Sequence, residues 1–281
     1  MMGDDQEKGP MVGVFDSGFG GLTVLRALLP RIPSANYVYL GDTARLPYGA
    51  KSRETIARYA VESARFLEDR GCEYLVIACN TATALALDDI RRAVSVPVLG
   101  VIEPGADSAK RAIGEAGGGE AGGDVLVLAT SATVQSHAYR EACAAVGLRA
   151  TELACPLLVP LVEEGWIDHP VTKEVLRIYL SEALAKCAPQ AVLLGCTHYP
   201  LIAGAIEETL RGLGSQAVVI DSAEATAAAA SAALVSQRES KPDSLATFEC
   251  FATDSVEKFQ RLGSLFLRQP IGRVHHLDLG G

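Results

Sequence analysis

The sequence predicts an α/β protein built from two similar α/β domains, with mainly parallel sheets sandwiched by helices. The first supporting observation is that short β-rich runs alternate with helical stretches along almost the whole chain. The second is that strands such as "YLVIAC" (74–79) lack polar alternation, as expected when both faces are covered. The third is a weak internal duplication at nearly constant offset, which indicates two related halves.

The expected strands are short apolar runs, and each helix follows one of them with apolar residues at helical spacing. The strands are 11–15, 36–42, 74–79, 96–101, 125–130, 149–155, 191–196, 217–221, 246–253 and 274–279. The helices are 20–30, 53–71, 82–94, 104–116, 134–147, 172–187, 200–214, 223–237 and 256–267, and "PLLVPLVEEG" (156–165) follows the sixth strand. Gly71 is a C-cap residue for the second helix, and Pro104 stands in the first turn of the fourth.

The domain limits follow from this order of elements. We expect a first α/β domain over 11–99 plus 209–281 and a second over 100–208, so that the chain crosses twice through hinges. Residues 1–10 are polar and acidic and read as a flexible tail. The glycine-rich stretch 114–124 predicts a flexible surface loop.

The duplicated segments each end in a polar cluster. "MVGVFDSGFGG" (11–21) resembles "DVLVLATSATV" (124–134), and "YLVIACNTAT" (74–83) resembles "AVLLGCTHYP" (191–200). Ligands of open parallel sheets bind beyond the carboxyl ends of the strands, where Cys79 and Cys196 both fall. If the two halves face one another, these cysteines lie on opposite walls of one interdomain cleft.

Two thiols across a cleft can perform acid–base chemistry. A thiol at a helix start feels the positive end of the helix dipole, so we expect its pKa to fall and thiolate to be available near neutrality. A thiolate can then remove a proton from a carbon while a thiol supplies one to the opposite face, which inverts a stereocentre. Alternatives to this acid–base role remain open. The two cysteines can be small buried hydrophobic residues. Cys196 and His198 can form a nucleophilic pair, or bind a metal, although two further metal ligands are missing.

The first loop, "VGVFDSGFGGLT", mimics a dinucleotide-binding fingerprint, with Asp42 ending the next strand. The match fails because Thr23 replaces the third glycine and Asp16 would place a negative charge in the phosphate site. We interpret Asp16 as a carboxylate at the cleft mouth, Ser17 as a hydroxyl ligand and the glycines as tight-turn residues. A plain capping role for Asp16 and Ser17 is the alternative.

Composition excludes several classes of protein. A net charge of −9 with scattered basic residues argues against nucleic-acid binding. No run reaches the roughly 18 apolar residues of a membrane span, and we expect no membrane association. The seven cysteines are odd in number and include no Cys-x-x-Cys, which favours reduced thiols in the cytoplasm and disfavours a structural zinc site.

Five motifs together resemble the glutamate racemases, the bacterial family of two-cysteine amino-acid racemases. They are "FDSGFGGLTVL" (15–25), "LPYGAKS" (46–52), "ACNTAT" (78–83), "ACPLLVPLVEEG" (154–165) and "LGCTHYPLI" (194–202). The resemblance implies an active site between two α/β domains and interconversion of L- and D-glutamate without pyridoxal phosphate, metal or other cofactor. It also implies a homodimer and a supply of D-glutamate for peptidoglycan, and hence for cell-wall synthesis and cell shape.

The resemblance also implies residue roles. Cys79 and Cys196 would be the acid–base thiols, with Asp16 tuning the first and His198 and Glu163, or its neighbour Glu164, tuning the second. Side chains and backbone that would contact glutamate are Asp16, Ser17, Tyr48, Gly49, Asn80, Thr81, Thr130, Thr133, Thr197 and His198. Asp16 would face the substrate ammonium group, and no arginine clamp is evident.

Two rival functions remain. An aspartate racemase, or another two-cysteine isomerase, shares the strand–cysteine arrangement, although "GCTHYP" and "PYG" argue against it. A regulatory binding protein could retain the fold, although it would not need both thiols. Exchange of the substrate α-hydrogen with solvent separates these three functions.

Overall fold

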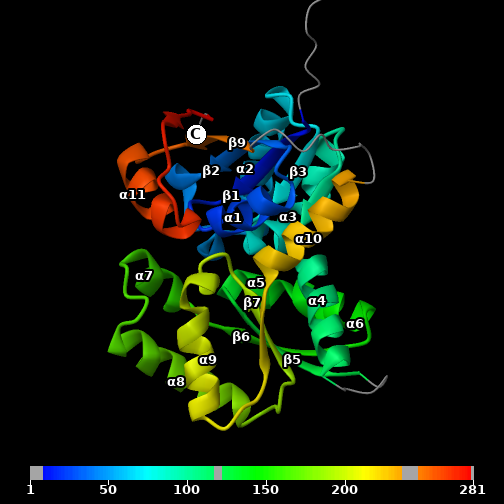
Figure 1. Cartoon of the computed structure of the whole chain (residues 1–281), viewed down its shortest axis with the longest axis vertical. Helices are drawn as coiled ribbons and strands as arrows, with labels where there is room; N and C mark the ends of the chain where they lie inside the picture. The colour runs from blue at the N-terminus through cyan, green and yellow to red at the C-terminus, as the bar shows by residue number, and fades with distance from the viewer. Residues whose placement is uncertain (1–8, 117–121, 236–245, 280–281) are drawn as a thin grey trace, which may run out of the picture.

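The computed structural model describes residues 9–116, 122–235 and 246–279, and it forms two lobes that each contain one parallel sheet (Figure 1). The predicted fold class is confirmed. Residues 1–8 of the predicted tail and 117–121 of the predicted loop lie outside the described residues. Within the described ranges, no helix is both long and apolar enough to cross a membrane.

The larger sheet has six strands in the order β10-β9-β2-β1-β3-β4, all paired in parallel. Their bounds are β1 (Met11–Asp16), β2 (Asn36–Gly41), β3 (Tyr74–Ile77), β4 (Val98–Gly100), β9 (Thr247–Ala252) and β10 (Val274–His276). The central strand β1 pairs Asp16 with Gly41 and Phe15 with Ile77. This register aligns the carboxyl ends of β1, β2 and β3 along one edge.

Helices cover both faces of this sheet because alternate residues of its strands point to opposite sides. Phe15 belongs to a buried cluster with residues of α2 (Arg53–Asp69) and α3 (Asn80–Ala93). Its neighbour Val14 belongs to a second cluster with residues of three other helices. These helices are α1 (Leu22–Arg31), α10 (Ser222–Val235) and α11 (Val256–Leu267).

The smaller sheet has four parallel strands in the order β6-β5-β7-β8. Their bounds are β5 (Asp124–Ala129), β6 (Arg149–Ala154), β7 (Ala191–Gly195) and β8 (Val218–Asp221). Figure 1 shows α4 (Ile102–Glu115) and α6 (Ala138–Ala145) on one side of it and α8 (Pro170–Leu184) and α9 (Ala203–Gly212) on the other. The remaining connections contain two short α-helices, α5 (Ser131–Ser136) and α7 (Leu158–Glu163). They also contain three 3₁₀ helices, η1 (Thr43–Arg45), η2 (Tyr48–Ala50) and η3 (Tyr199–Ile202).

The chain passes between the lobes in two places. The first crossing runs from β4 into α4. The second runs from β8 into α10. Because β8 pairs with β7, residues 218–221 belong to the smaller sheet, and by sheet membership the return crossing comes after 221 instead of at 209. The limits of the two domains as independent units stay a prediction.

The lobes share apolar packing as well as covalent connections. One buried cluster contains Val14 and Leu25 of the larger lobe together with Leu126 and Leu193 of the smaller lobe. Helix α10 packs against both α1 and α4. The two sheets are therefore held so that the carboxyl ends of β1, β3, β5 and β7 meet at one cavity.

Candidate active site

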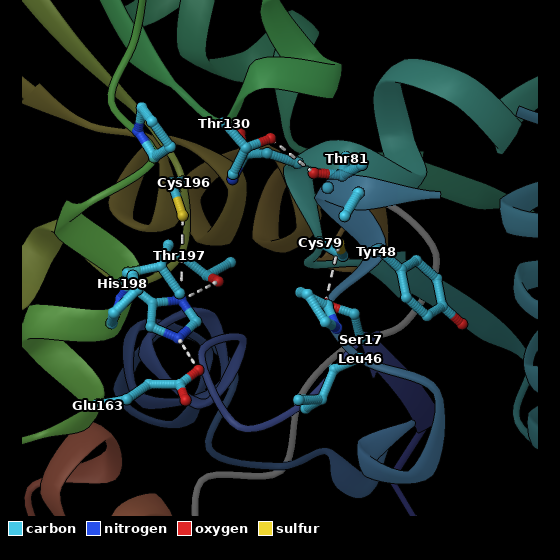
Figure 2. Close-up of a pocket in the computed structure, with 18 of the residues that line it drawn as sticks. Ser17, Leu46, Tyr48, Cys79, Thr81, Thr130, Glu163, Cys196, Thr197 and His198 are labelled. Atoms are coloured by element: carbon cyan, nitrogen blue, oxygen red, sulfur yellow. Dashed lines mark hydrogen bonds and ion pairs between the residues drawn. The ribbon is translucent and has the colours of Figure 1, made fainter. Parts of the chain in front are cut away.

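A cavity of ≈ 320 Å³ lies between the lobes (Figure 2). Eleven of the residues predicted for the site line it: Ser17, Tyr48, Gly49, Cys79, Asn80, Thr81, Thr130, Glu163, Cys196, Thr197 and His198. Figure 2 shows Cys79 and Ser17 on one side of the cavity and Cys196, His198 and Glu163 on the other. The thiols therefore come from corresponding strand ends of the two sheets and face a common space.

Cys79 forms the N-cap of α3. Its thiol donates to the Ser17 hydroxyl at 3.5 Å and accepts from the Ala82 backbone N–H at 3.4 Å. Burial, and after it the nearby Asp16 carboxylate, raise the pKa of Cys79 to about 12 against the opposing effect of its hydrogen bonds. The prediction of a lowered pKa is thus wrong for Cys79, because burial and a like charge outweigh the helix start.

Asp16 lies behind the cavity wall and does not line it. Its side chain is buried, its Oδ2 accepts from the Gly18 backbone N–H at 2.9 Å, and its Oδ1 has no partner among the described residues. Burial raises the pKa of Asp16, while the imidazole of His198 lowers it. Asp16 therefore affects the cavity through the pKa of Cys79.

Cys196 follows β7 and has an imidazole beside it. Its sulfur lies 3.9 Å from His198 Nδ1, and His198 Nε2 lies 3.2 Å from Glu163 Oε1. Burial lowers the pKa of His198, but hydrogen bonds and charge from Cys196 and Glu163 outweigh it and raise that pKa to about 10. His198 is therefore an imidazolium at neutral pH and places a positive charge beside the Cys196 sulfur.

Glu163, and not Glu164, lines the cavity. Glu163 is partly buried at the end of α7, and its second oxygen lies 3.9 Å from Lys258 Nζ of the larger lobe. Glu164 is exposed to solvent. Of the two adjacent glutamates, Glu163 is thus the one that lies beside His198.

Neutral donors gather at the starts of α3 and α5. The hydroxyls of Thr81, Thr130 and Thr133 form a triangle with O–O distances of 3.0, 3.2 and 3.0 Å. Thr81 and Thr130 line the cavity, whereas Thr133 is fully buried behind them. Asn80 lines the cavity, and its Nδ2 has no partner among the described residues. These groups can bind a carboxylate, and Thr133 can orient the two outer hydroxyls.

Tyr48 contributes a buried ring to the wall and is anchored from behind. Its hydroxyl donates to the buried carboxylate of Asp42, which also pairs with Arg45 Nε at 2.7 Å. Thr253 donates to the same carboxylate at 2.9 Å from the turn after β9. Asp42, which resembled a nucleotide-binding acid in the sequence, therefore fixes the wall of the cavity.

Gly20 allows the lobes to meet closely. A Cβ at Gly20 would lie 2.3 Å from Thr197 Oγ1 and 2.7 Å from His198 Nδ1. Gly20 does not have a positive φ, so close approach, and not turn conformation, requires glycine here. The hydroxyl of neighbouring Thr23 donates to the Thr197 carbonyl at 3.1 Å and strengthens the same contact.

Sequence reasoning missed the less polar part of the wall. The additional lining residues are Gly18, Phe19, Leu46, Pro47, Ala50, Ser131, Pro156, Val159 and Pro160. Most of them stand inside the motifs already singled out, but apolar types carry no chemical signal by themselves. None of the described lining residues is Lys or Arg, so the cavity offers neutral donors and one imidazole.

The comparison with protein families decides the classification. A model of the family described as "Asp/Glu/Hydantoin racemase" matches residues 23–230 of this chain. The chain belongs to this racemase family. The resemblance predicted from the five motifs is thus confirmed.

Individual members of the racemase family match over nearly the whole chain. Glutamate racemase from Koribacter versatilis (strain Ellin345) is 49% identical, with 97% of this chain and 98% of that protein covered. A crystal structure of glutamate racemase from Thermus thermophilus in complex with β-chloro-D-alanine has a TM-score of 0.83 and 40% identity, covering 97% of this chain and 98% of that one. The enzyme from Francisella tularensis, in complex with D-glutamate, has a TM-score of 0.84, 32% identity and the same coverages.

Aspartate racemases are more distant members of the same fold. The enzyme from Picrophilus torridus has a TM-score of 0.56 and 21% identity, covering 81% of this chain and 95% of that one. This likeness extends to the fold alone.

Proposed function

We propose that this chain interconverts L- and D-glutamate by two-base proton transfer between Cys79 and Cys196. The observation that carries the proposal is that two thiols, one from each lobe, line the same small cavity. The full-length similarity to glutamate racemases supports glutamate as the substrate. The product D-glutamate would enter peptidoglycan synthesis, and the reduced thiols are suited to the cytoplasm.

The different surroundings of the two thiols suit them to different roles. Cys79, whose pKa is about 12, carries a proton at neutral pH and acts as the acid. Cys196 lies beside an imidazolium and acts as the base. The proton that Cys79 will donate is therefore in place before the substrate brings the α-proton that Cys196 will accept.

The reaction breaks one C–H bond and forms another on the opposite face. The Cys196 thiolate takes the α-proton, and the electron pair left on carbon delocalises into the adjacent carboxylate. The Cys79 S–H bond then breaks as its proton moves to that carbon. The product has the opposite configuration, Cys196 now holds the proton, and Cys79 holds the charge. The protein is then ready to convert the other enantiomer.

The surrounding donors can hold the two substrate carboxylates. Asn80 Nδ2, the Thr81 and Thr130 hydroxyls and the helix-start amides form one group of donors near the lobe interface. Ser17 and Thr197 lie beside the two thiols and can bind the substrate close to its reacting carbon. Preorganised donors of this kind also stabilise charge that develops on the carboxylate.

The deciding experiment measures exchange of the glutamate α-hydrogen in D₂O, by NMR, without added cofactor. We expect exchange and racemisation by the unaltered protein. Cys79→Ser and Cys196→Ser should each lower racemisation by on the order of 10²–10⁴-fold, because each removes a general acid or base. Cys187→Ser is the matched control, since this half-buried thiol donates to the Ala183 carbonyl and is not among the described residues that line the cavity.

Other outcomes select the rival functions. Exchange of aspartate without exchange of glutamate would identify an aspartate racemase. Exchange of neither would favour a binding protein that retains the fold. Full racemisation by either serine variant would overturn the two-base mechanism itself.

We also propose a homodimer, on the family resemblance alone and without assigning an interface. Light scattering coupled to gel filtration should give twice the chain mass of 29.5 kDa. A monomeric mass at working concentration would contradict it.

A further inference from the structure

We infer that Tyr139 is a positioning residue that acts on both halves of the catalytic site without touching substrate. It stands on α6 of the smaller lobe, is fully buried and does not line the cavity. Neither the sequence motifs nor the proposed mechanism assigns it a role. The inference rests on the proposed function, since it concerns how that site recognises a carboxylate.

The hydroxyl of Tyr139 reaches across the lobe interface. It donates to Asn80 Oδ1 at 2.5 Å, and Asn80 is the first residue of α3, directly after Cys79. The amide oxygen of Asn80 thus accepts the phenol hydrogen bond, and the amide Nδ2 remains available as a donor. Nδ2 is buried and has no partner among the described residues.

An unpaired buried donor is costly unless a ligand completes it. Because Asn80 lines the cavity, a substrate carboxylate is the acceptor that would satisfy Nδ2. The opposite amide orientation would turn an oxygen toward that carboxylate and repel it. The Tyr139 hydrogen bond therefore selects the amide orientation that suits an anionic substrate.

The ring of Tyr139 contacts the other cysteine segment. A Cβ at Gly195, the residue before Cys196, would lie 2.8 Å from Tyr139 Cε2. Glycine at this position therefore leaves room for the ring against the end of β7. One side chain thus touches the residue after the first thiol and the residue before the second, and it fixes both strand ends relative to each other.

The test is a double-mutant cycle with Tyr139→Phe, Asn80→Ala and the double variant, measured as kcat and KM for glutamate racemisation. Tyr139→Phe keeps the ring and removes the hydroxyl. We expect KM to rise about tenfold, the value of one hydrogen bond, with a smaller change in kcat. In the Asn80→Ala background the same substitution should change KM by less than about twofold.

Tyr37→Phe is the matched control for loss of a buried phenol hydroxyl. Tyr37 donates to the Leu28 and Ile32 carbonyls and lies away from the cavity. Its substitution should leave KM unchanged. Thermal unfolding of every variant separates a change at the site from a change in stability.

Asn80→Asp keeps the inference falsifiable if Tyr139→Phe does not fold. Tyr139 would hold one carboxylate oxygen and leave the other facing the substrate, so KM should exceed that of Asn80→Ala. Equal KM values for the two Asn80 variants would overturn the inference. It would also be overturned by an unchanged KM in folded Tyr139→Phe, or by an equal effect of that substitution with and without Asn80.

Failure of the proposed function looks different. In that case the unaltered protein would not exchange the α-hydrogen of glutamate at all. If it does exchange it while Tyr139→Phe behaves like Tyr37→Phe, only the role of Tyr139 is refuted.

Discussion

The two thiol sites are alike in topology and different in electrostatics. Cys79 and Cys196 each follow a parallel strand and precede a helical turn, and each lines the same cavity. Cys79 has a buried carboxylate behind it, whereas Cys196 has an imidazolium beside it. The surroundings therefore favour a protonated first sulfur and place a positive charge beside the second. A repeated fold supplies the geometry, and unequal neighbours supply the direction in which the first proton moves.

Replacing the imidazole should have the largest effect on this difference. His198→Asn removes the positive charge beside Cys196 while keeping a polar side chain. We expect kcat/KM to fall on the order of 10²–10³-fold, because the proposed base loses the positively charged hydrogen-bond partner beside its sulfur. The loss must be equal in both directions, since L- and D-glutamate have the same free energy. Racemisation followed by circular dichroism checks this, and a loss below about threefold would contradict it.

Neutralising the carboxylate behind Cys79 tests the other half of the comparison. In Asp16→Asn the negative charge that raises the pKa of Cys79 is removed, so that pKa should fall. We expect kcat/KM to drop about 10–100-fold and the alkaline limb of its pH profile to move to lower pH. An alkaline limb at its original position would show that Asp16 does not act through Cys79.

The adjacent glutamates provide a smaller and internally controlled effect. Glu163→Gln keeps a hydrogen-bond acceptor for His198 but removes the charge, and we expect about a tenfold loss of kcat/KM. Glu164→Gln alters an exposed neighbour on the same helix end and should cost less than about twofold. Equal losses in the two variants would mean that the distinction between these residues is wrong.

Stability against pH gives the smallest expected effect. The pKa of His198 rises from 6.5 to about 10 on folding, so the folded state binds the extra proton. Its stabilising contribution is complete below pH 6.5 and is lost as the pH rises toward 10. Between pH 6.5 and 9 we expect the Tm of the unaltered protein to fall by a few degrees more than that of His198→Asn. Parallel Tm curves for the two proteins would refute this linkage.

The fold class and the positions of both thiols at strand ends could be predicted from the sequence, because the end of a buried strand has a recognisable local pattern. An unbroken apolar run followed by Cys-Asn-Thr or Cys-Thr-His marks a buried strand that stops at a polar site. The same logic placed Ser17 and Thr197 at the cavity, since each closely follows a strand of its own sheet, whereas Thr130 was predicted from the family resemblance.

Other features depend on contacts that no local pattern encodes. The burial that raises the pKa of Cys79 comes from residues packed by the whole lobe, so a helix-start argument gave the wrong direction. Tyr139 and Thr133 matter through partners on α3, and nothing in their own segment indicates which helix faces them. Strand β8 carries the same apolar pattern as its neighbours, and only pairing with β7 assigns it to the smaller sheet.

The absence of Lys and Arg among the described lining residues has a consequence for turnover. Two substrate carboxylates held mainly by neutral donors keep part of their desolvation cost uncompensated, so the residence of glutamate in the cavity is short. Its affinity should also respond little to ionic strength, because the His198 imidazolium in the wall is buried and already paired with Glu163. L- and D-glutamate are substrate and product of the same reaction. A short residence time therefore allows either enantiomer to dissociate quickly after the reaction.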